Sequence, residues 1–281
     1  MQRVFILTLS LGMLLTMDVK SRESAIEAVD TENLRVCADP SNLPFSNEKG
    51  EGFENAIADL LGEKLNIPVV YENFPQVIGY SSVYGWGDNE GGGWCERLRK
   101  DWGNNQNGPV IYQLGVRGDG IEKVSSRWEK EWSSRGETRR NKPKAILLNV
   151  GLNDTAAIGQ INGRHQLDID GFEYGLERLI NEMNSQTNVF VIGLTPVDES
   201  KMPFAGCLWY SNDFCNSYER RIEEVCLNQN VPFLPTFREM YSDKRSKNWI
   251  THDGIHLNSE GHFWLFQRLK SWEILTKWKG S

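Results

Sequence analysis

The chain has 281 residues and a formal net charge of −7, from 38 acidic and 31 basic residues without a block of like charge. This length allows one large α/β domain, or a domain of about 200 residues with an appendage. A nucleic-acid-binding face needs clustered Lys and Arg, so the charge pattern argues against a nucleic-acid partner.

The first 22 residues have the pattern of a secretory signal. Met1-Gln2-Arg3 gives a basic start, and residues 4–17 form an apolar run that is too short to span a bilayer comfortably. Residues 18–22 contain no clear small-x-small cleavage site. We expect a signal peptide over residues 1–22 and a periplasmic or secreted protein, with an uncleaved membrane anchor and a cytoplasmic N-terminus as alternatives.

The cysteines are too few for a disulfide framework. They are Cys37, Cys95, Cys207, Cys215 and Cys226. Cys207 and Cys215 are close enough in sequence to bridge a loop, and free thiols are an equal alternative. No C-x-x-C pair occurs, so we expect no zinc site built on cysteine.

Residues 33–76 predict one βαβ unit. It consists of a strand over 34–38, an amphipathic helix over 52–65 and a second strand over 67–71. The stretch LRVCADPSNLPFSNEKGEGFEN, with PVVYENFPQ after the helix, resembles the start of the periplasmic solute-binding proteins associated with methanol dehydrogenases. That family binds solutes between two lobes, and the resemblance covers only the opening part of one. Because a lone βαβ unit buries too little surface to fold alone, we interpret it as a fused fragment without solute binding.

From residue 77 to the C-terminus, predicted strands alternate with helices. The strands are 77–78, 109–114, 144–150, 189–194 and 231–234; the helices are 94–102, 121–135, 172–184, 217–229 and 259–277. Asn258 is the expected N-cap of the last helix, and residues 195–213 form a proline-containing insertion. This alternation predicts a parallel sheet covered on both faces, in a domain over residues 77–281.

Five residues with suitable chemistry lie in loops at one edge of this predicted sheet. Ser81, Gly118 and Asn153 each follow a strand, and Asp253 and His256 lie between the last strand and the last helix. The working loops of parallel sheets lie at the carboxyl ends of the strands, so we expect these residues to gather there. A serine needs an adjacent base, an imidazole held by a carboxylate is such a base, and an oxyanion needs N–H donors.

Four motifs together resemble those of the SGNH, or GDSL-type, hydrolase family. They are Gly79-x-Ser81, Gly118 in VRGDG, Gly151-Leu152-Asn153-Asp154 and Asp253-Gly254-Ile255-His256. The resemblance runs from about Val77 to the C-terminus. It implies an α/β three-layer sandwich with a parallel, flavodoxin-like sheet.

The resemblance also implies a role for each motif residue. Ser81 would be the nucleophile, His256 the general base and then acid, and Asp253 its orienting carboxylate. The Ser81 N–H, the Gly118 N–H and the Asn153 side chain would form the oxyanion hole. The implied activity is hydrolysis of a small-molecule carboxylic ester, thioester or acetylated sugar, without a metal or another cofactor.

The first motif departs from the family pattern. Tyr80 stands where the family has an Asp, which is not the catalytic acid but braces the nucleophile turn. Residues 73–76 also place Pro75 where the family has an apolar run, and proline removes a ladder donor. We therefore expect a nucleophile that is less well held. The second hypothesis is a non-catalytic binding or accessory protein whose triad is misassembled.

Several of these residues also have plainer interpretations. Ser81 or Ser82 could be turn residues, Gly118 a turn glycine, and Asn153 with Asp154 a helix cap. His252 and His256 would suggest metal ligands on a helix, but the glycine between them predicts a loop.

Other aromatic and histidine side chains near the motifs have no fixed role. We expect Tyr84 and Trp86 to pack and His262 to be a surface or packing residue. His165 is a candidate for the substrate mouth, and residues 202–204 are a candidate for part of a groove.

Overall fold

The computed structural model describes residues 34–36, 41–42, 46–47, 51–71, 75–103, 109, 111–133 and 143–279. The expected signal peptide and Cys37 lie outside the described residues, so what was expected of them stays a prediction. Within the described ranges, no helix is both long enough and apolar enough to cross a membrane.

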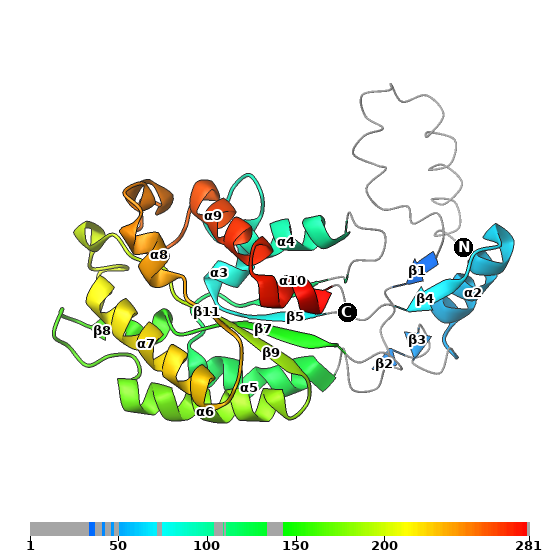
Figure 1. The fold of residues 1–281 in the computed structure, drawn as a ribbon, viewed down its shortest axis with the longest axis horizontal. Coiled ribbons are helices and arrows are strands. Elements are labelled where there is room, and N and C mark those ends of the chain that lie inside the picture. The colour runs from blue at the N-terminus through cyan, green and yellow to red at the C-terminus, as the bar shows by residue number, and fades with distance from the viewer. Residues whose placement is uncertain are drawn as a thin grey trace, which may run out of the picture.

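A five-stranded sheet in the order β11-β9-β7-β5-β6 forms the centre of the fold (Figure 1). Its strands are β5 (Gln76–Gly79), β6 (Tyr112–Gly115), β7 (Ala145–Asn149), β9 (Asn188–Ile192) and β11 (Phe233–Leu234). Every neighbouring pair is parallel. β6 lies on one side of β5, and β7, β9 and β11 follow in order on the other side, which is the expected flavodoxin-like order. Ligands bind such sheets at the point where the strand order reverses.

Successive residues of β7 point to opposite faces of the sheet, and each face is covered by helices. Ile146 and Leu148 join one buried cluster, whereas Ala145 and Leu147 join the other. Helices α5 (Ile121–Trp132), α6 (Ile169–Asn184) and α7 (Asn212–Asn228) cover the first face. Helices α4 (Gly93–Gly103), α9 (Ser259–Lys270) and α10 (Glu273–Lys279) cover the second, so the expected three-layer sandwich is present.

Short elements connect these layers. They are α3 (Ser81–Tyr84), α8 (Phe237–Ser242), the 3₁₀ helices η4 (Asn153–Thr155), η5 (Glu199–Lys201) and η6 (Ser246–Trp249), and the antiparallel pair β8 (Ala157–Ile158) and β10 (Leu208–Trp209). Most of them lie in the loops at the edge of the sheet where the motifs were expected. They therefore shape the surroundings of the site.

Helix boundaries differ from the sequence expectation where capping and packing decide them. Helix α7 begins at Asn212 rather than 217, because the Ser211 side chain accepts a hydrogen bond from the Phe214 amide. Helix α6 begins at Ile169 rather than 172, with Asp168 as its cap. The expected single helix over 259–277 is two helices. The break at residues 271–272 places Trp272 in the core, 5.8 Å edge-on from the Phe190 ring.

The expected βαβ unit forms at the N-terminal side. Strand β1 (Leu34–Val36) pairs in parallel with β4 (Val69–Tyr71), α2 (Phe53–Leu65) connects them, and β2 (Ser41–Asn42) pairs with β3 (Ser46–Asn47). Helix α2 turns small residues, Ala58 and Gly62, toward the strands. Its large apolar side chains are exposed: Phe53, Ile57, Leu60, Leu61 and Leu65. A two-stranded ribbon is too narrow to cover them.

Candidate active site

The structure joins Ser81, His256 and Asp253 in a chain of hydrogen bonds. The Ser81 Oγ lies 2.9 Å from His256 Nε2, and His256 Nδ1 lies 2.6 Å from Asp253 Oδ2. Ser81 follows strand β5, whereas the other two residues come from the loop before α9. Segments that are far apart in the sequence therefore meet at the carboxyl edge of the sheet.

Asp253 is held as a carboxylate. Its Oδ1 accepts hydrogen bonds from Thr251 Oγ1 at 2.7 Å, from the Ile255 amide at 3.0 Å and from the His256 amide at 3.1 Å. Partial burial opposes ionisation, but the hydrogen bonds from His256, Thr251 and the backbone outweigh it and keep the pKa of Asp253 well below its ordinary value. A carboxylate only accepts, so the His256 proton lies on Nδ1 and Nε2 is free to accept from the Ser81 hydroxyl.

Ser81 rather than Ser82 faces the imidazole. Ser82 Oγ is used elsewhere, since it accepts a hydrogen bond from Trp94 Nε1 at 3.0 Å. Ser81 is the first residue of α3, a single turn, so its amide N–H has no partner within that helix.

Tyr80 anchors the nucleophile turn in the core. Its side chain is 1% exposed and belongs to the cluster under α5, α6 and α7. Burial raises the pKa of Tyr80 far above its ordinary value, with Ser82 and Thr195 close to its hydroxyl. Neither of them meets the hydroxyl at good hydrogen-bond geometry. The turn therefore has a buried aromatic ring where the family pattern has a carboxylate.

Gly118 follows β6 and Asn153 follows β7, the two strands on either side of β5, so both residues lie at the same edge of the sheet. Asn153 Nδ2 donates to the Asp119 carbonyl at 2.9 Å, and its Oδ1 accepts from the Tyr210 hydroxyl at 3.4 Å. An amide nitrogen has two hydrogens, so a second one remains available. Gly118 has a φ of +77°, which favours glycine, and open space around its α-carbon.

Asp154, not Asn153, acts as the helix cap. Its carboxylate accepts a hydrogen bond from the Ile121 amide, at 3.1 Å to Oδ1, at the start of α5. Burial raises the pKa of Asp154 to about 7, although this hydrogen bond opposes the change. Asp154 caps α5, a helix that begins 33 residues earlier in the chain, so the spacing of residues in the sequence could not have shown this contact.

Asp88 connects the loop after the nucleophile turn to the start of α9. Its carboxylate accepts hydrogen bonds from the amides of residues 90, 91 and 93, from Ser259 Oγ at 2.7 Å and from Arg97 Nε at 3.0 Å. Although burial opposes ionisation, these hydrogen bonds keep the pKa of Asp88 well below its ordinary value. No motif in the sequence marks Asp88, because two of its partners lie in α4 and α9.

His262 makes a second connection between the same segments. Its Nδ1 accepts from the Trp94 amide at 3.2 Å, and its Nε2 donates to the Trp86 carbonyl at 3.1 Å. Burial lowers the pKa of His262 to about 4, so the ring is neutral near pH 7. His262, Leu265 and Leu269 are spaced so that all three lie on the buried face of α9. Of the two expectations for His262, packing is therefore confirmed and a surface position is wrong.

Gly87 allows these two segments to approach closely. A Cβ atom added at Gly87 would lie 2.2 Å from the Leu257 carbonyl oxygen, next to His256. Any side chain at this position would push the segment that follows α3 away from the segment that contains His256 and Leu257.

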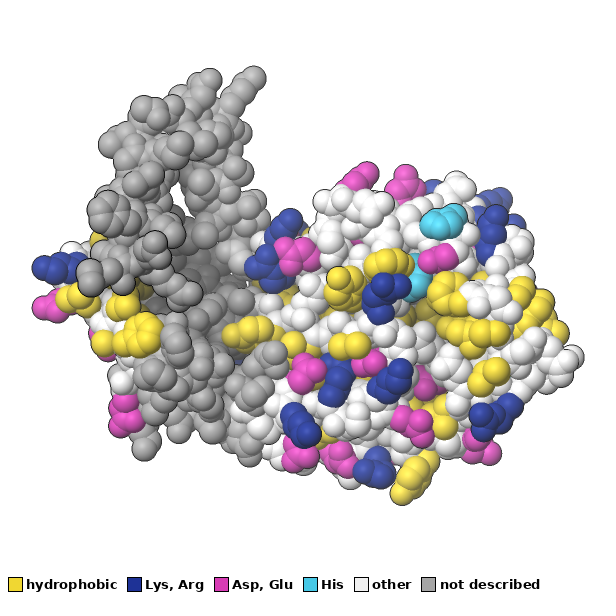
Figure 2. All heavy atoms as spheres, turned by 180° about the vertical axis from the view of Figure 1, so that it is seen from behind, with side chains coloured by type: hydrophobic (Ala, Val, Ile, Leu, Met, Phe, Trp, Pro, Cys, Tyr) yellow, Lys and Arg dark blue, Asp and Glu magenta, His cyan; other side chains and the backbone are white. Residues whose placement is uncertain are grey.

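Two aromatic rings flank the imidazole. The Trp86 ring centroid lies 6.2 Å from that of His256, and the Phe204 centroid lies 6.1 Å from it. Phe204 thus brings the candidate groove segment 202–204 to the site. Tyr84 is 54% exposed, so the expectation that it packs is wrong. Histidine side chains reach the surface beside a band of hydrophobic side chains on the face in Figure 2.

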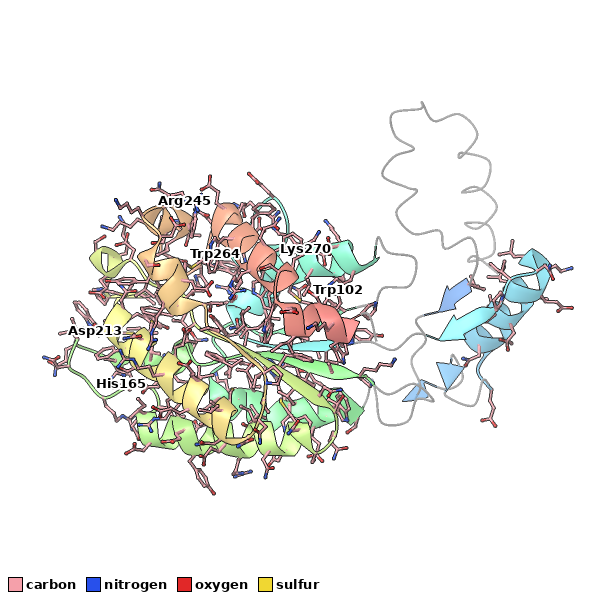
Figure 3. The ribbon with its side chains drawn as sticks, in the orientation of Figure 1. Trp102, His165, Asp213, Arg245, Trp264 and Lys270 are labelled. Atoms are coloured by element: carbon pink, nitrogen blue, oxygen red, sulfur yellow. The ribbon has the colours of Figure 1, made fainter. Side chains whose placement is uncertain are left out.

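His165 is positioned by its own packing. Its Nδ1 lies 2.7 Å from the Thr155 carbonyl oxygen, and its ring lies 4.4 Å edge-on from the Phe214 ring. Its ring also lies 5.9 Å from the Tyr218 ring, so its ring contacts are with α7, beside which Figure 3 shows it.

Cys207 is exposed, Cys215 is buried, and both are free thiols, so the structure has no bridge between them. In the part of the chain that the structure describes, no three His, Cys, Asp or Glu side chains form a group suited to a metal ion. His252 and His256 lie in a turn, as expected from the intervening glycine.

Known structures share this arrangement of layers. A lipase/acylhydrolase from Enterococcus faecalis superposes with a TM-score of 0.58 at 19% identity, covering 74% of this chain and 96% of that one. A psychrotrophic esterase from a Pseudoalteromonas species gives 0.55 at 13% identity, with coverages of 75% and 100%. An acetyl xylan esterase from Geobacillus stearothermophilus gives 0.53 at 15%, with 71% and 93%.

The family assignment follows from the sequence over most of the fold. The profile of the GDSL-like Lipase/Acylhydrolase family matches residues 77–263. The sheet, its covering layers and this match define an SGNH-type hydrolase fold. The chain belongs to the GDSL-like lipase/acylhydrolase family.

The N-terminal resemblance is also supported, by short matches. An uncharacterised protein in the cycB 3′ region of Paracoccus denitrificans is 60% identical over 42 residues, 15% of this chain and 51% of that protein. Protein MoxJ of the same organism is 53% identical over 36 residues, 13% of each chain. The chain thus spans about half of the first relative and a small part of the second.

Proposed function

We propose that the protein is a serine ester hydrolase acting on carboxylic esters, with Ser81 as nucleophile, His256 as general base and Asp253 as its orienting acid. The observation that carries this proposal is the chain of contacts from Ser81 Oγ to His256 Nε2 at 2.9 Å and from His256 Nδ1 to Asp253 Oδ2 at 2.6 Å. These distances lie within the range needed for proton transfer.

In the acylation step, Ser81 Oγ attacks the ester carbonyl carbon while its proton passes to His256 Nε2. Asp253 stabilises the imidazolium that forms, and stays a carboxylate because its pKa is low. The carbonyl oxygen becomes an oxyanion, with the Ser81 amide, the Gly118 amide and the remaining Asn153 Nδ2 hydrogen as proposed donors. Collapse of this intermediate breaks the bond to the alcohol oxygen, which takes the proton from His256.

In the deacylation step, water attacks the acyl-serine carbonyl and gives a proton to His256. Collapse of the second intermediate returns that proton to Ser81 Oγ and releases the carboxylic acid. The products are one acid and one alcohol, and the enzyme regains its starting protonation. No metal or organic cofactor enters either step.

The alternative of a non-catalytic accessory protein depended on a misassembled triad. The contacts of Ser81 and His256 favour the enzyme instead. Ser81 is 3% exposed and His256 is 8% exposed. An incoming ester would therefore displace the little water that reaches them.

The proposal is tested by hydrolysis of 4-nitrophenyl butyrate with wild type, Ser81→Ala and Ser82→Ala. We expect Ser81→Ala to lower kcat by at least about 10³-fold, to the background rate. Ser82→Ala is the matched control, because it removes a hydroxyl one residue away that does not face His256. Equal rates for wild type and Ser81→Ala would contradict the proposal.

A further inference from the structure

A stacked pair of exposed side chains lies at the rim of the candidate active site. The Arg117 guanidinium carbon lies 3.4 Å from the Trp86 ring centroid. The Trp86 ring in turn lies 6.2 Å from the His256 ring, and Arg117 directly precedes Gly118. The guanidinium therefore lies close to the proposed base, because Trp86 contacts both it and His256. It also belongs to the residue next to Gly118, whose amide is a proposed oxyanion donor.

Arg117 has no acidic partner in the described part of the chain. Its neighbour Arg127 shows the contrasting case. That guanidinium contacts Asp119 at 2.8 Å and donates to the Gly79 carbonyl at 2.9 Å, so it serves the fold. Arg117 is exposed, and among the residues that the structure describes its only partner is the Trp86 ring.

Stacking leaves the donors of Arg117 available in a fixed plane. A guanidinium that lies on an aromatic face keeps its N–H groups at its edge, where they suit a carboxylate or phosphate in a bidentate geometry. Contact with the ring also restricts the side chain, so less freedom is lost when a ligand binds.

An exposed cation at this rim opposes the net negative charge of the molecule. At −7 the protein repels anionic ligands in general, so an unpaired cation at the rim creates a local preference. Val116, 44% exposed, and Trp86, 38% exposed, provide apolar surface next to it. Such a rim suits an ester that has an apolar body and one anionic group.

We propose that Arg117, held against Trp86, binds an anionic group of the substrate, so that the enzyme prefers esters with a carboxylate or phosphate close to the scissile bond. This proposal rests on the proposed esterase function and specifies its substrate class. Arg117 acts in substrate recognition and takes no part in bond making or breaking.

The test compares matched pairs of esters in which the acidic group is either charged or blocked by methylation. 4-Nitrophenyl hydrogen succinate and its methyl ester place the charge on the acyl side. 4-Acetoxybenzoate and its methyl ester place it on the alcohol side, and 4-acetoxyphenyl phosphate with its dimethyl ester replaces the carboxylate by a phosphate. Values of kcat/KM are measured for wild type, Arg117→Gln, Arg117→Lys and the control Arg220→Gln, which removes an exposed arginine of α7.

We expect Arg117→Gln to lower the ratio of charged to neutral kcat/KM by about 10-fold or more in at least one pair, mainly through KM. Arg117→Lys should retain part of the preference, Arg220→Gln should retain all of it, and added salt should reduce it in the wild type. The pair that responds identifies the side and the kind of anion.

Two failures are distinguishable. If the neutral esters are hydrolysed in a Ser81-dependent way, but Arg117→Gln leaves all three ratios within about 2-fold of wild type, the anion site is refuted and the esterase stands. If no ester is hydrolysed in a Ser81-dependent way, the proposed function fails and this inference fails with it.

Discussion

Asn153 supplies the only side-chain donor among the proposed oxyanion donors, and two hydrogen bonds orient its amide. The Asp119 carbonyl holds its Nδ2 at 2.9 Å, and the Tyr210 hydroxyl lies 3.4 Å from its Oδ1. A donor that is oriented before the reaction stabilises the oxyanion without reorganisation in the transition state.

We therefore predict that Asn153→Ala lowers kcat for 4-nitrophenyl butyrate by about 10²-fold to 10³-fold with little change in KM. Tyr210→Phe is the control, because it removes only the longer contact and should lower kcat by less than about 5-fold. Steady-state kinetics of both variants check this. A kcat for Asn153→Ala within about 3-fold of wild type would exclude Asn153 from the oxyanion hole.

The Tyr80 side chain lies in the core directly before Ser81. Its hydroxyl is buried without a well-formed hydrogen bond, so Tyr80→Phe should leave the free energy of unfolding unchanged or raise it by up to about 1 kcal/mol. Tyr80→Asp restores the family residue, but it buries a carboxylate near Glu219 and should lower that free energy by about 3 kcal/mol or more.

Urea unfolding of the two Tyr80 variants measures these changes, and the kcat of Tyr80→Phe should stay within about 3-fold of wild type. A wild-type stability for Tyr80→Asp would show that the turn does not depend on an apolar anchor.

The sequence predicts the catalytic candidates better than their surroundings. Ser81, Asp253 and His256 lie in motifs that resemble those of the SGNH family, so the resemblance implied a role for each of them before the structure was considered. The Arg117–Trp86 stack and the bond between Asn153 and Asp119 join residues from different loops. No local pattern marks such pairs, because they depend on how the loops fold over the sheet.

At the scale of elements, His262 connects α9 to the nucleophile loop through two hydrogen bonds. Its folded-state pKa of about 4 lies below the ordinary value of 6.5. Between these values the unfolded chain binds a proton that the folded protein does not. The stability that depends on neutral His262 is thus complete above pH 6.5 and is lost as the pH falls toward 4.

We predict that the wild type loses up to about 3 kcal/mol more stability than His262→Gln between pH 6.5 and pH 4. Glutamine keeps a donor for the Trp86 carbonyl but does not titrate. Asp154 and Glu219, whose pKa values burial raises to about 7, act in the opposite direction but are present in both proteins. Urea unfolding across this range measures the difference, and parallel pH profiles would contradict the assignment.

The elements themselves followed from the sequence where periodicity was strong. The buried strand β7 and helix α5 begin within a residue of their expected positions. The start of α7 and the break between α9 and α10 did not follow, because a Ser211 cap and the packing of Trp272 decide them. Local capping and tertiary contacts override a hydrophobic pattern at its ends.

At the scale of the whole molecule, a parallel sheet carries the site, and the βαβ unit before it contributes no residue to that site. The strand order reverses at β5, because β6 lies on one side of it and β7 lies on the other. The site lies at this point, which is the position expected for a ligand in such a sheet. Helix α2 exposes its apolar side, as expected for an opening fragment of a larger lobe.

If Ser81 is the nucleophile that His256 activates, it should react with reagents that trap such a serine. The most direct test is reaction of the full chain with a fluorophosphonate probe, followed by peptide mapping. We expect stoichiometric labelling on Ser81, none on Ser82, and loss of labelling in His256→Gln although that protein stays folded. An unlabelled Ser81 in folded wild-type protein, or equal labelling without His256, would contradict this role of Ser81.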